Sequence, residues 1–246
     1  MNFHEFGTEH EKCILLIHPL AVDWTVFSFC YPRLAENYRV IIPAMPGMDF
    51  DAPETDFISL EQHVTEIEDY LLSNGITELE GIYGCSMGGG AVIKMIANNR
   101  IQFKHIVVDA GITPYQLPKP ICFIIACCDF LMTSLGKLCS VKLLGYMFDP
   151  DKYTEENLVY VKTMLKFMSS KTIWNAFWST DNYEMPSPVS QPNAPIHYWY
   201  GEQEKEARKL DIQYVKATFE NLIFTENPGM DHAEFLPFIQ RNSAMH

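Results

Sequence analysis

Ser86 lies at the centre of a glycine-bounded motif, Gly84-Cys85-Ser86-Met87-Gly88, which has the form G-x-S-x-G. An apolar run, residues 79–83, precedes it, and a stretch of small and apolar residues, 88–97, follows it. Between a strand and a helix this motif makes a sharp, strained turn, and glycines avoid the clashes that side chains would cause there. The turn exposes the serine hydroxyl at the positive N-terminus of a helix. The motif therefore predicts that Ser86 is a nucleophile.

A serine hydroxyl needs a base to take its proton, and the base needs a third group to orient it. His232 follows the last predicted strand through a short loop, residues 227–231, and is the best candidate for the base. Glu204 comes just after the predicted strand 196–200, which gives the order serine, acid, histidine along the chain. Asp109, at the end of the strand beside that of the nucleophile, remains the alternative acid.

An oxyanion hole needs two hydrogen-bond donors aimed at the carbonyl oxygen as it becomes charged. The backbone N–H of Met87, the residue after the nucleophile, is predicted to be one donor. The other is expected from the loop His18-Pro19-Leu20-Ala21, which follows the first strong strand. Proline has no N–H, so Leu20 is the predicted donor and His18 is expected to be structural.

Six apolar runs lack polar alternation, which is typical of strands that are buried on both faces of a parallel sheet. Helical patterns lie between them; for example, Ser59 and Gln62 match a capping box and Gly75 marks a helix end. This alternation predicts a mostly parallel, doubly wound α/β sheet, with room for one antiparallel edge strand or a short hairpin before residue 13. The runs are residues 13–17, 39–42, 79–83, 106–108, 196–200 and 222–224.

The alternation of strands and helices breaks between residues 112 and 194. An insert of this length is too long for a structureless loop in a compact domain. Proline-rich segments bound it, and apolar segments inside it (121–135, 141–148 and 158–178) are predicted to be helices. The expected organisation is a core formed by residues 1–111 and 195–246, with a helical cap formed by residues 112–194 and inserted before the penultimate strand.

These residues and their order resemble the α/β-hydrolase superfamily over nearly the whole chain, residues 15–234. Ile17-His18-Pro19 is similar to the family's oxyanion loop, and the run 38–47 is similar to its next strand and Pro-Gly turn. Pro19 stands where the family usually has glycine, and Glu204 stands where aspartate is commoner. The resemblance implies a triad of Ser86, Glu204 and His232, and a cap that sets substrate choice.

The cap is rich in large apolar side chains, most of which are expected to pack within the cap. Those that face the cleft would favour an acyl or aryl group, and the predicted substrate is a small apolar carboxylic ester or thioester. No metal or nucleotide motif occurs, so we expect no cofactor and no metal. The side chains are Phe123, Phe130, Met132, Leu135, Tyr146, Met147, Phe148, Phe167, Met168, Trp174, Phe177 and Trp178.

Two other functions fit the same sequence. One is a small-molecule-binding protein with slow or no turnover on this fold. The other is a C–C hydrolase or lyase that uses the same triad. Measured turnover of an ester would exclude the first of these.

The whole-chain composition limits partners and compartment. A net charge of −13 argues against nucleic acids and anionic membranes, which need a basic face. Seven cysteines without a C-x-x-C pair, and an N-terminus without a visible secretory signal, favour the cytoplasm. The most apolar stretch, residues 121–128, is followed by Asp129, so we expect a buried or pocket-lining helix and no membrane span.

Overall fold

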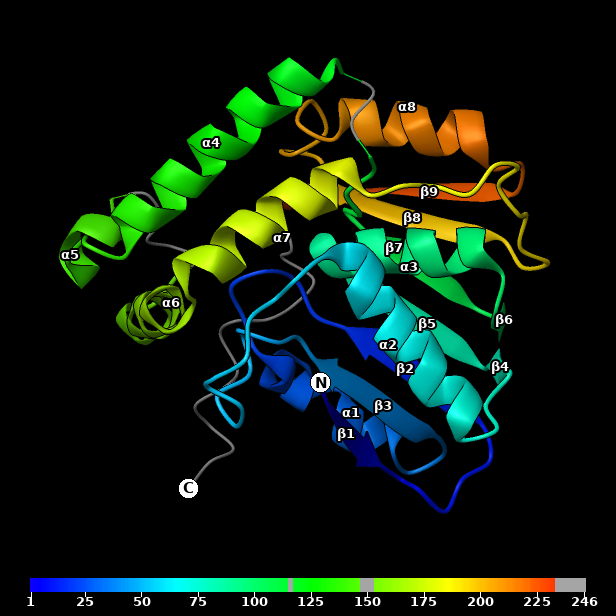
Figure 1. Cartoon of the computed structure of the whole chain (residues 1–246). Helices are drawn as coiled ribbons and strands as arrows, with labels where there is room; N and C mark the ends of the chain where they lie inside the picture. Colours follow the sequence, from blue (N-terminus) through cyan, green and yellow to red (C-terminus); the bar gives the residue numbers. More distant parts are fainter. Residues whose placement is uncertain (115–116, 147–152, 233–246) are drawn as a thin grey trace.

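The computed structural model of the chain describes residues 1–114, 117–146 and 153–232. A seven-stranded sheet in the order β1-β3-β2-β5-β7-β8-β9 crosses the molecule (Figure 1). β1 runs antiparallel to β3 at one edge, and all other neighbours in this sheet are parallel. The strands are β1 (Asn2–Phe6), β2 (Cys13–Ile17), β3 (Arg39–Ala44), β5 (Gly81–Cys85), β7 (Ile106–Asp109), β8 (Ile196–Gly201) and β9 (Leu222–Asn227).

Apolar side chains cover both faces of the sheet. In β2, Leu15 and Ile17 belong to the larger core cluster, whereas Leu16 belongs to a second cluster that also contains Phe27. Successive strand residues point to opposite faces, so an unbroken apolar run is buried only when both faces are covered. The prediction of a mostly parallel α/β sheet is confirmed. The core helices are η1 (Trp24–Phe29), α1 (Tyr31–Leu34), α2 (Leu60–Ser73), α3 (Met87–Asn98) and α8 (Lys209–Thr218).

The strand before Ser86 begins later than its sequence predicted. Residues 79–83 were expected to form one strand, but β5 runs from Gly81 to Cys85. The preceding residues form β4 (Glu78–Leu79), which pairs with β6 (Gln102–Phe103) in a separate two-stranded sheet. The apolar run is therefore divided between two sheets, and the longer strand ends directly at the nucleophile.

The capping box predicted at α2 is half formed. Ser59 Oγ accepts the Gln62 backbone N–H at 3.1 Å, as expected for an N-cap. The Gln62 side chain, however, donates to Glu66 at 2.8 Å, one turn further along the helix, and does not return to Ser59. Gly75, with φ +73°, follows the end of the helix as predicted.

The helices of the insert lie over the carboxyl end of the parallel strands, at the left and top of Figure 1. They come between β7 and β8, where a cap was predicted. The predicted segment 158–178 is two helices, because Ser169 caps a new one by accepting the Thr172 N–H. Residues 147 and 148 lie outside the described residues. The helices are α4 (Lys119–Gly136), α5 (Val141–Leu144), α6 (Glu155–Phe167) and α7 (Ser170–Asn182).

One prediction about the cap is only partly correct. The apolar stretch 121–128 was expected to form a buried or pocket-lining helix. It belongs to the 18-residue helix α4, which lines a pocket through Asp129 and Met132, but only Cys122, Ala126 and Gly136 of this helix are buried. By length and composition alone, α4 could cross a membrane. One side of α4 packs against α7 and lines the pocket, whereas apolar side chains on its other side, such as Ile124 and Leu131, are exposed.

Candidate active site

Ser86 occupies a strained turn between β5 and α3. Its φ is +53° and its ψ is −115°, a conformation that residues with a side chain rarely adopt. The Ser86 N–H donates to the Asp109 carbonyl at 2.8 Å, which anchors the turn to the neighbouring strand β7. The residue is the N-cap of α3 but makes no side-chain capping bond, so its hydroxyl is left for other partners.

The glycines on either side of Ser86 are required by close backbone packing. A Cβ on Gly84 would lie 2.2 Å from the Gly88 carbonyl oxygen. A Cβ on Gly88 would lie 2.4 Å from the Ile17 carbonyl oxygen, in the strand that leads to the oxyanion loop. The G-x-S-x-G pattern thus brings α3 close to two strands and aligns its N-terminus with Ser86.

The structure brings together three of the residues that the sequence singled out. His232 Nε2 lies 3.0 Å from Ser86 Oγ, and His232 Nδ1 lies 2.6 Å from Glu204 Oε2. Ser86 and Glu204 are buried, with exposed fractions of 6% and 4%. With Nδ1–H donating to the carboxylate, Nε2 is free to accept the hydroxyl proton. The sequence also predicts that residues 233–236 begin a short terminal helix, but these residues lie outside the part of the chain that the structure describes.

Glu204 is held from two further sides. Its Oε1 accepts the Gly201 N–H at 2.9 Å, and the Arg208 Nε lies 3.9 Å from its Oε2. Burial alone would raise the pKa of Glu204, but the hydrogen bond and charge of His232, the Gly201 N–H and Arg208 lower it below its usual value. Glu204 therefore stays ionised beside the imidazole.

Asp109, the alternative acid, has a different partner. Its Oδ2 accepts the Tyr83 hydroxyl at 2.6 Å, and its side chain is 2% exposed. Burial raises the pKa of Asp109 to about 6, although the Tyr83 hydrogen bond opposes this. Asp231, next to the imidazole in sequence, accepts the His232 backbone N–H. The geometry thus favours Glu204 as the partner of the His232 ring.

The loop after β2 is fixed by His18. Its Nε2 accepts the Met45 N–H at 3.1 Å, so Nδ1 carries the proton and donates to the Pro19 carbonyl at 2.9 Å. That carbonyl and the Leu20 N–H belong to one planar trans peptide and point in opposite directions. Holding the carbonyl of Pro19 therefore aims the Leu20 N–H the other way. Both Leu20 and Met87 line the pocket at Ser86.

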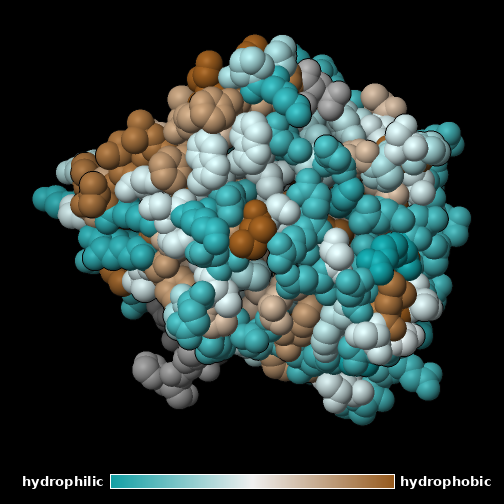
Figure 2. Space-filling view, viewed as in Figure 1, coloured by the Kyte–Doolittle hydropathy of each residue, from teal (hydrophilic) through white to brown (hydrophobic). Residues whose placement is uncertain are grey.

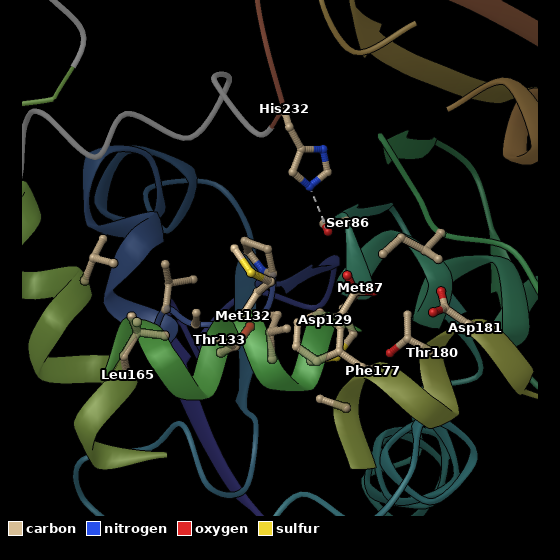
Figure 3. A pocket seen from close by; sticks show the side chains of 18 of the residues that line it. Ser86, Met87, Asp129, Met132, Thr133, Leu165, Phe177, Thr180, Asp181 and His232 are labelled. Carbon is tan, nitrogen blue, oxygen red and sulfur yellow. Dashed lines mark hydrogen bonds between the residues drawn. The ribbon is translucent and has the colours of Figure 1, made fainter. Parts of the chain in front are cut away.

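A pocket of about 580 Å³ opens at Ser86 and His232 and extends under the cap (Figure 3). Met132 of α4, Leu165 of α6 and Phe177 of α7 form part of its apolar wall. Met132 and Phe177 were among the cap residues considered from the sequence. Much of the remaining aromatic set packs between α4 and α7, where the Trp174 and Trp178 rings are stacked.

The pocket also has polar groups that the sequence analysis missed. Thr180 and Asp181 lie together at one end of the lining, opposite Leu165 (Figure 3), and Asp129 lies on α4. Arg208 lines the pocket beside Glu204, and its spacing of four residues from Glu204 on the way into α8 was the available signal. For Thr180 and Asp181 no local signal existed, because only the packing of α7 turns them inward.

One group of metal-ligating side chains lies close together in the described part of the chain. The ligand atoms of His4, Asp49 and Asp51 lie within 4.8 Å of one another. None of the three lines the pocket at Ser86. A bond from Asn2 to Asp49 already occupies one of these carboxylate oxygens.

Comparison with solved structures places the fold. No protein-family model and no curated protein sequence matches the chain. An α/β hydrolase family protein from Desulfitobacterium hafniense superposes with a TM-score of 0.73 and 19% identity, covering 96% of this chain and 94% of that one. MenH from S. aureus superposes with a TM-score of 0.71 and 14% identity, covering 96% of this chain and 92% of that one. A structure from a study of carboxylesterases of Nitrososphaera gargenis superposes with a TM-score of 0.68 and 15% identity, covering 94% of this chain and 86% of that one. The chain has the α/β-hydrolase fold, as the resemblance predicted.

Proposed function

We propose that the protein is a serine hydrolase that cleaves a small apolar carboxylic ester or thioester without a cofactor. The observation that carries this proposal is the chain of hydrogen-bond contacts from Glu204 through His232 to Ser86, in the lining of a pocket. Several similar structures are named as esterases, an epoxide hydrolase or an enol-lactonase, which supports a hydrolase of this fold.

In this mechanism Ser86 Oγ attacks the carbonyl carbon while His232 Nε2 takes the hydroxyl proton. The carbonyl oxygen becomes an oxyanion that the N–H groups of Leu20 and Met87 stabilise. His232 then returns the proton to the leaving oxygen or sulfur, and the bond to the leaving group breaks. Water, activated by the same imidazole, attacks the acyl-enzyme and releases the acid and Ser86.

The pocket supports the size and character of the proposed substrate. Its volume, about 580 Å³, is that of a site for a small molecule. Leu144, Val161 and Leu165 offer an apolar surface for an acyl chain, and Met132 adapts to varied shapes. The ester group would lie at Ser86, with the acyl or alcohol part against this wall.

A fluorophosphonate probe tests the proposed nucleophile directly. The native chain is expected to gain one covalent adduct, and Ser86→Ala is expected to gain none. Ser73→Ala, which changes a serine on α2 that only bonds the Tyr70 carbonyl, is the matched control and should label fully. An intact protein that stays unlabelled but binds small esters would instead indicate a binding protein.

A series of aryl esters with increasing acyl length tests the substrate class. Specificity constants are expected to rise with chain length until the apolar wall is filled, and then to fall. A flat series, or a preference for charged acyl groups, would contradict the apolar assignment.

A further inference from the structure

We propose that the outward side of α4 binds the surface of a lipid bilayer, with the helix lying along the surface. This side consists of Ile121, Ile124, Cys128, Leu131, Leu135 and the following Leu138, and we call it the outer face of α4. Brown, hydrophobic side chains gather in this region in Figure 2, at the upper left, over α4 and α5.

The outer face of α4 is apolar and open to solvent. Ile124 is 61% exposed and Leu131 is 57% exposed, and Leu138 reaches 83%. The five residues on α4 are spaced by three and four along the helix, so they form one stripe, and Leu138 continues it just after the helix. Soluble proteins rarely leave an apolar stripe of this length uncovered without a partner for it.

The charges around the outer face favour lipid over a second copy of the chain. Residues 119–146 contain the exposed Lys119 and Lys142 but only one carboxylate, Asp129, which lines the pocket. The third lysine of this segment, Lys137, donates to the Met168 carbonyl within the cap. The whole chain, by contrast, has 31 acidic and 18 basic residues. Lysines at the edge of an apolar surface can reach lipid phosphates while the apolar residues enter the bilayer.

A dimer through α4 would lack the contacts that usually specify one. The stripe has the heptad spacing of a helix pair, but the flanking positions, residues 125, 127, 132 and 134, carry no charge. An antiparallel two-fold pairing would bring Lys119 near Lys142 of the second copy, and no carboxylate of this segment faces them.

The inner side of α4 argues against a helix that crosses the bilayer. Cys122 and Ala126 are buried, and Phe123 packs against Trp174 and Trp178 of α7. Asp129 lies at mid-helix, where a charge in hydrocarbon is costly. A helix lying on the surface keeps all these contacts.

The outer face meets the pocket at Met132. This residue is 57% exposed and also lines the pocket that contains Ser86. An apolar ester dissolved in lipid could therefore pass along α4 to the nucleophile; this last step rests on the proposed function, whereas lipid binding itself does not.

Flotation with phosphatidylcholine vesicles tests the proposal on the full chain. The native protein is expected to float with the vesicles. Ile124→Gln/Leu131→Gln should lower the partition coefficient at least about tenfold, because two apolar side chains no longer enter the lipid. Ile223→Gln is the matched control, since Ile223 is 44% exposed but lies on β9, and it should float like the native protein. Leu138→Gln, in the loop after α4, gives a second variant with little effect on folding.

Four outcomes would overturn the proposal. The first is that the native protein does not float, and the second is that Ile223→Gln loses as much flotation as Ile124→Gln/Leu131→Gln. The third is that the protein stays on the vesicles after a carbonate wash at pH 11, which indicates a spanning helix. The fourth is a dimer in lipid-free solution that Ile124→Gln/Leu131→Gln dissociates. Ser86→Ala is expected to float normally and to lack turnover. Failure of the hydrolase assignment is thereby separated from failure of lipid binding.

Discussion

The turn at Ser86 and the helix α4 are built on opposite principles. At the turn, a Cβ on Gly84 has no room, and the side chains of Ser86, His232 and Glu204 are each held by a hydrogen-bond contact. On α4, only three of 18 residues are buried, and apolar side chains face outward. The proposed active site is thus fixed by close packing in the core, whereas the outer face of α4 leaves apolar surface exposed.

The largest expected effect separates the two acids of the core. Glu204→Gln should lower kcat by about three to four orders of magnitude, because the imidazole loses the carboxylate that fixes its tautomer. Asp109→Asn should lower kcat less than about tenfold, since Asp109 bonds Tyr83 and not His232. Steady-state kinetics on one aryl ester give both values, and the reverse ranking would make Asp109 the acid.

A methyl group at the turn tests how little space the core leaves. Gly84→Ala should cost more than about 3 kcal/mol of unfolding free energy, because its Cβ would lie 2.2 Å from the Gly88 carbonyl oxygen. Gly81→Ala, in the same strand, is the control: its nearest neighbour would be Ile14 Cγ1 at 3.7 Å, an ordinary contact. Urea denaturation measures both, and equal costs would show that the turn can relax.

The pH dependence of stability reports the burial of Asp109. Its pKa is about 6 in the folded chain, against 3.8 for a free carboxyl. Because the pKa is raised in the folded chain, the contribution of protonated Asp109 to the unfolding free energy is fully present below about pH 4. This contribution, on the order of 3 kcal/mol, is lost as the pH rises through 6. Asp109→Asn should therefore gain stability relative to the native chain between pH 4 and pH 7. Parallel stability curves for the two proteins would contradict this.

His18 tests whether the oxyanion loop is aimed by its hydrogen bonds. His18→Phe keeps a ring but loses both bonds, so kcat should fall roughly 10- to 100-fold with little change in KM. His63→Phe is the matched control, because His63 is buried and neither of its ring nitrogens has a hydrogen-bond partner among the described residues. A kcat for His18→Phe equal to that of His63→Phe would remove the positioning role.

The smallest effect is expected on the outer face of α4. Leu131→Ala should change the unfolding free energy by less than about 0.5 kcal/mol, since the side chain is already 57% exposed. Leu158→Ala, on α6 and 8% exposed, should cost about 2 to 5 kcal/mol. Thermal or urea unfolding compares the two, and a large cost for Leu131→Ala would place it in the packed cap.

The sequence predicted the sheet and the order of the site residues because both have local signals. Apolar runs without polar alternation mark buried strands, and G-x-S-x-G marks the turn at Ser86. The sequence favoured Glu204 as the acid but kept Asp109 as an alternative, because both lie at the carboxyl ends of strands in the same sheet. The tertiary contacts separate the two: Glu204 bonds the His232 ring, whereas Asp109 bonds Tyr83.

The cap was harder to predict because its faces depend on tertiary contacts. The apolar stretch at Ile121 indicated a buried or pocket-lining helix, yet composition alone does not say which side of a helix has a neighbour. Thr180 and Asp181 likewise gave no signal, because only the position of α7 turns them toward the pocket. The boundary of the cap as a separate domain stays a prediction.

The central claim is that Ser86 Oγ transfers its proton to His232 and becomes acylated. Rapid mixing with an excess of an aryl ester, followed by acid quenching and peptide mass spectrometry, measures this directly. The native chain is expected to release a burst of the aryl alcohol equal to the enzyme concentration, with the acyl group on the peptide that contains Ser86. Turnover without an acylated Ser86, or an acyl group on Cys85 or another residue, would contradict the account.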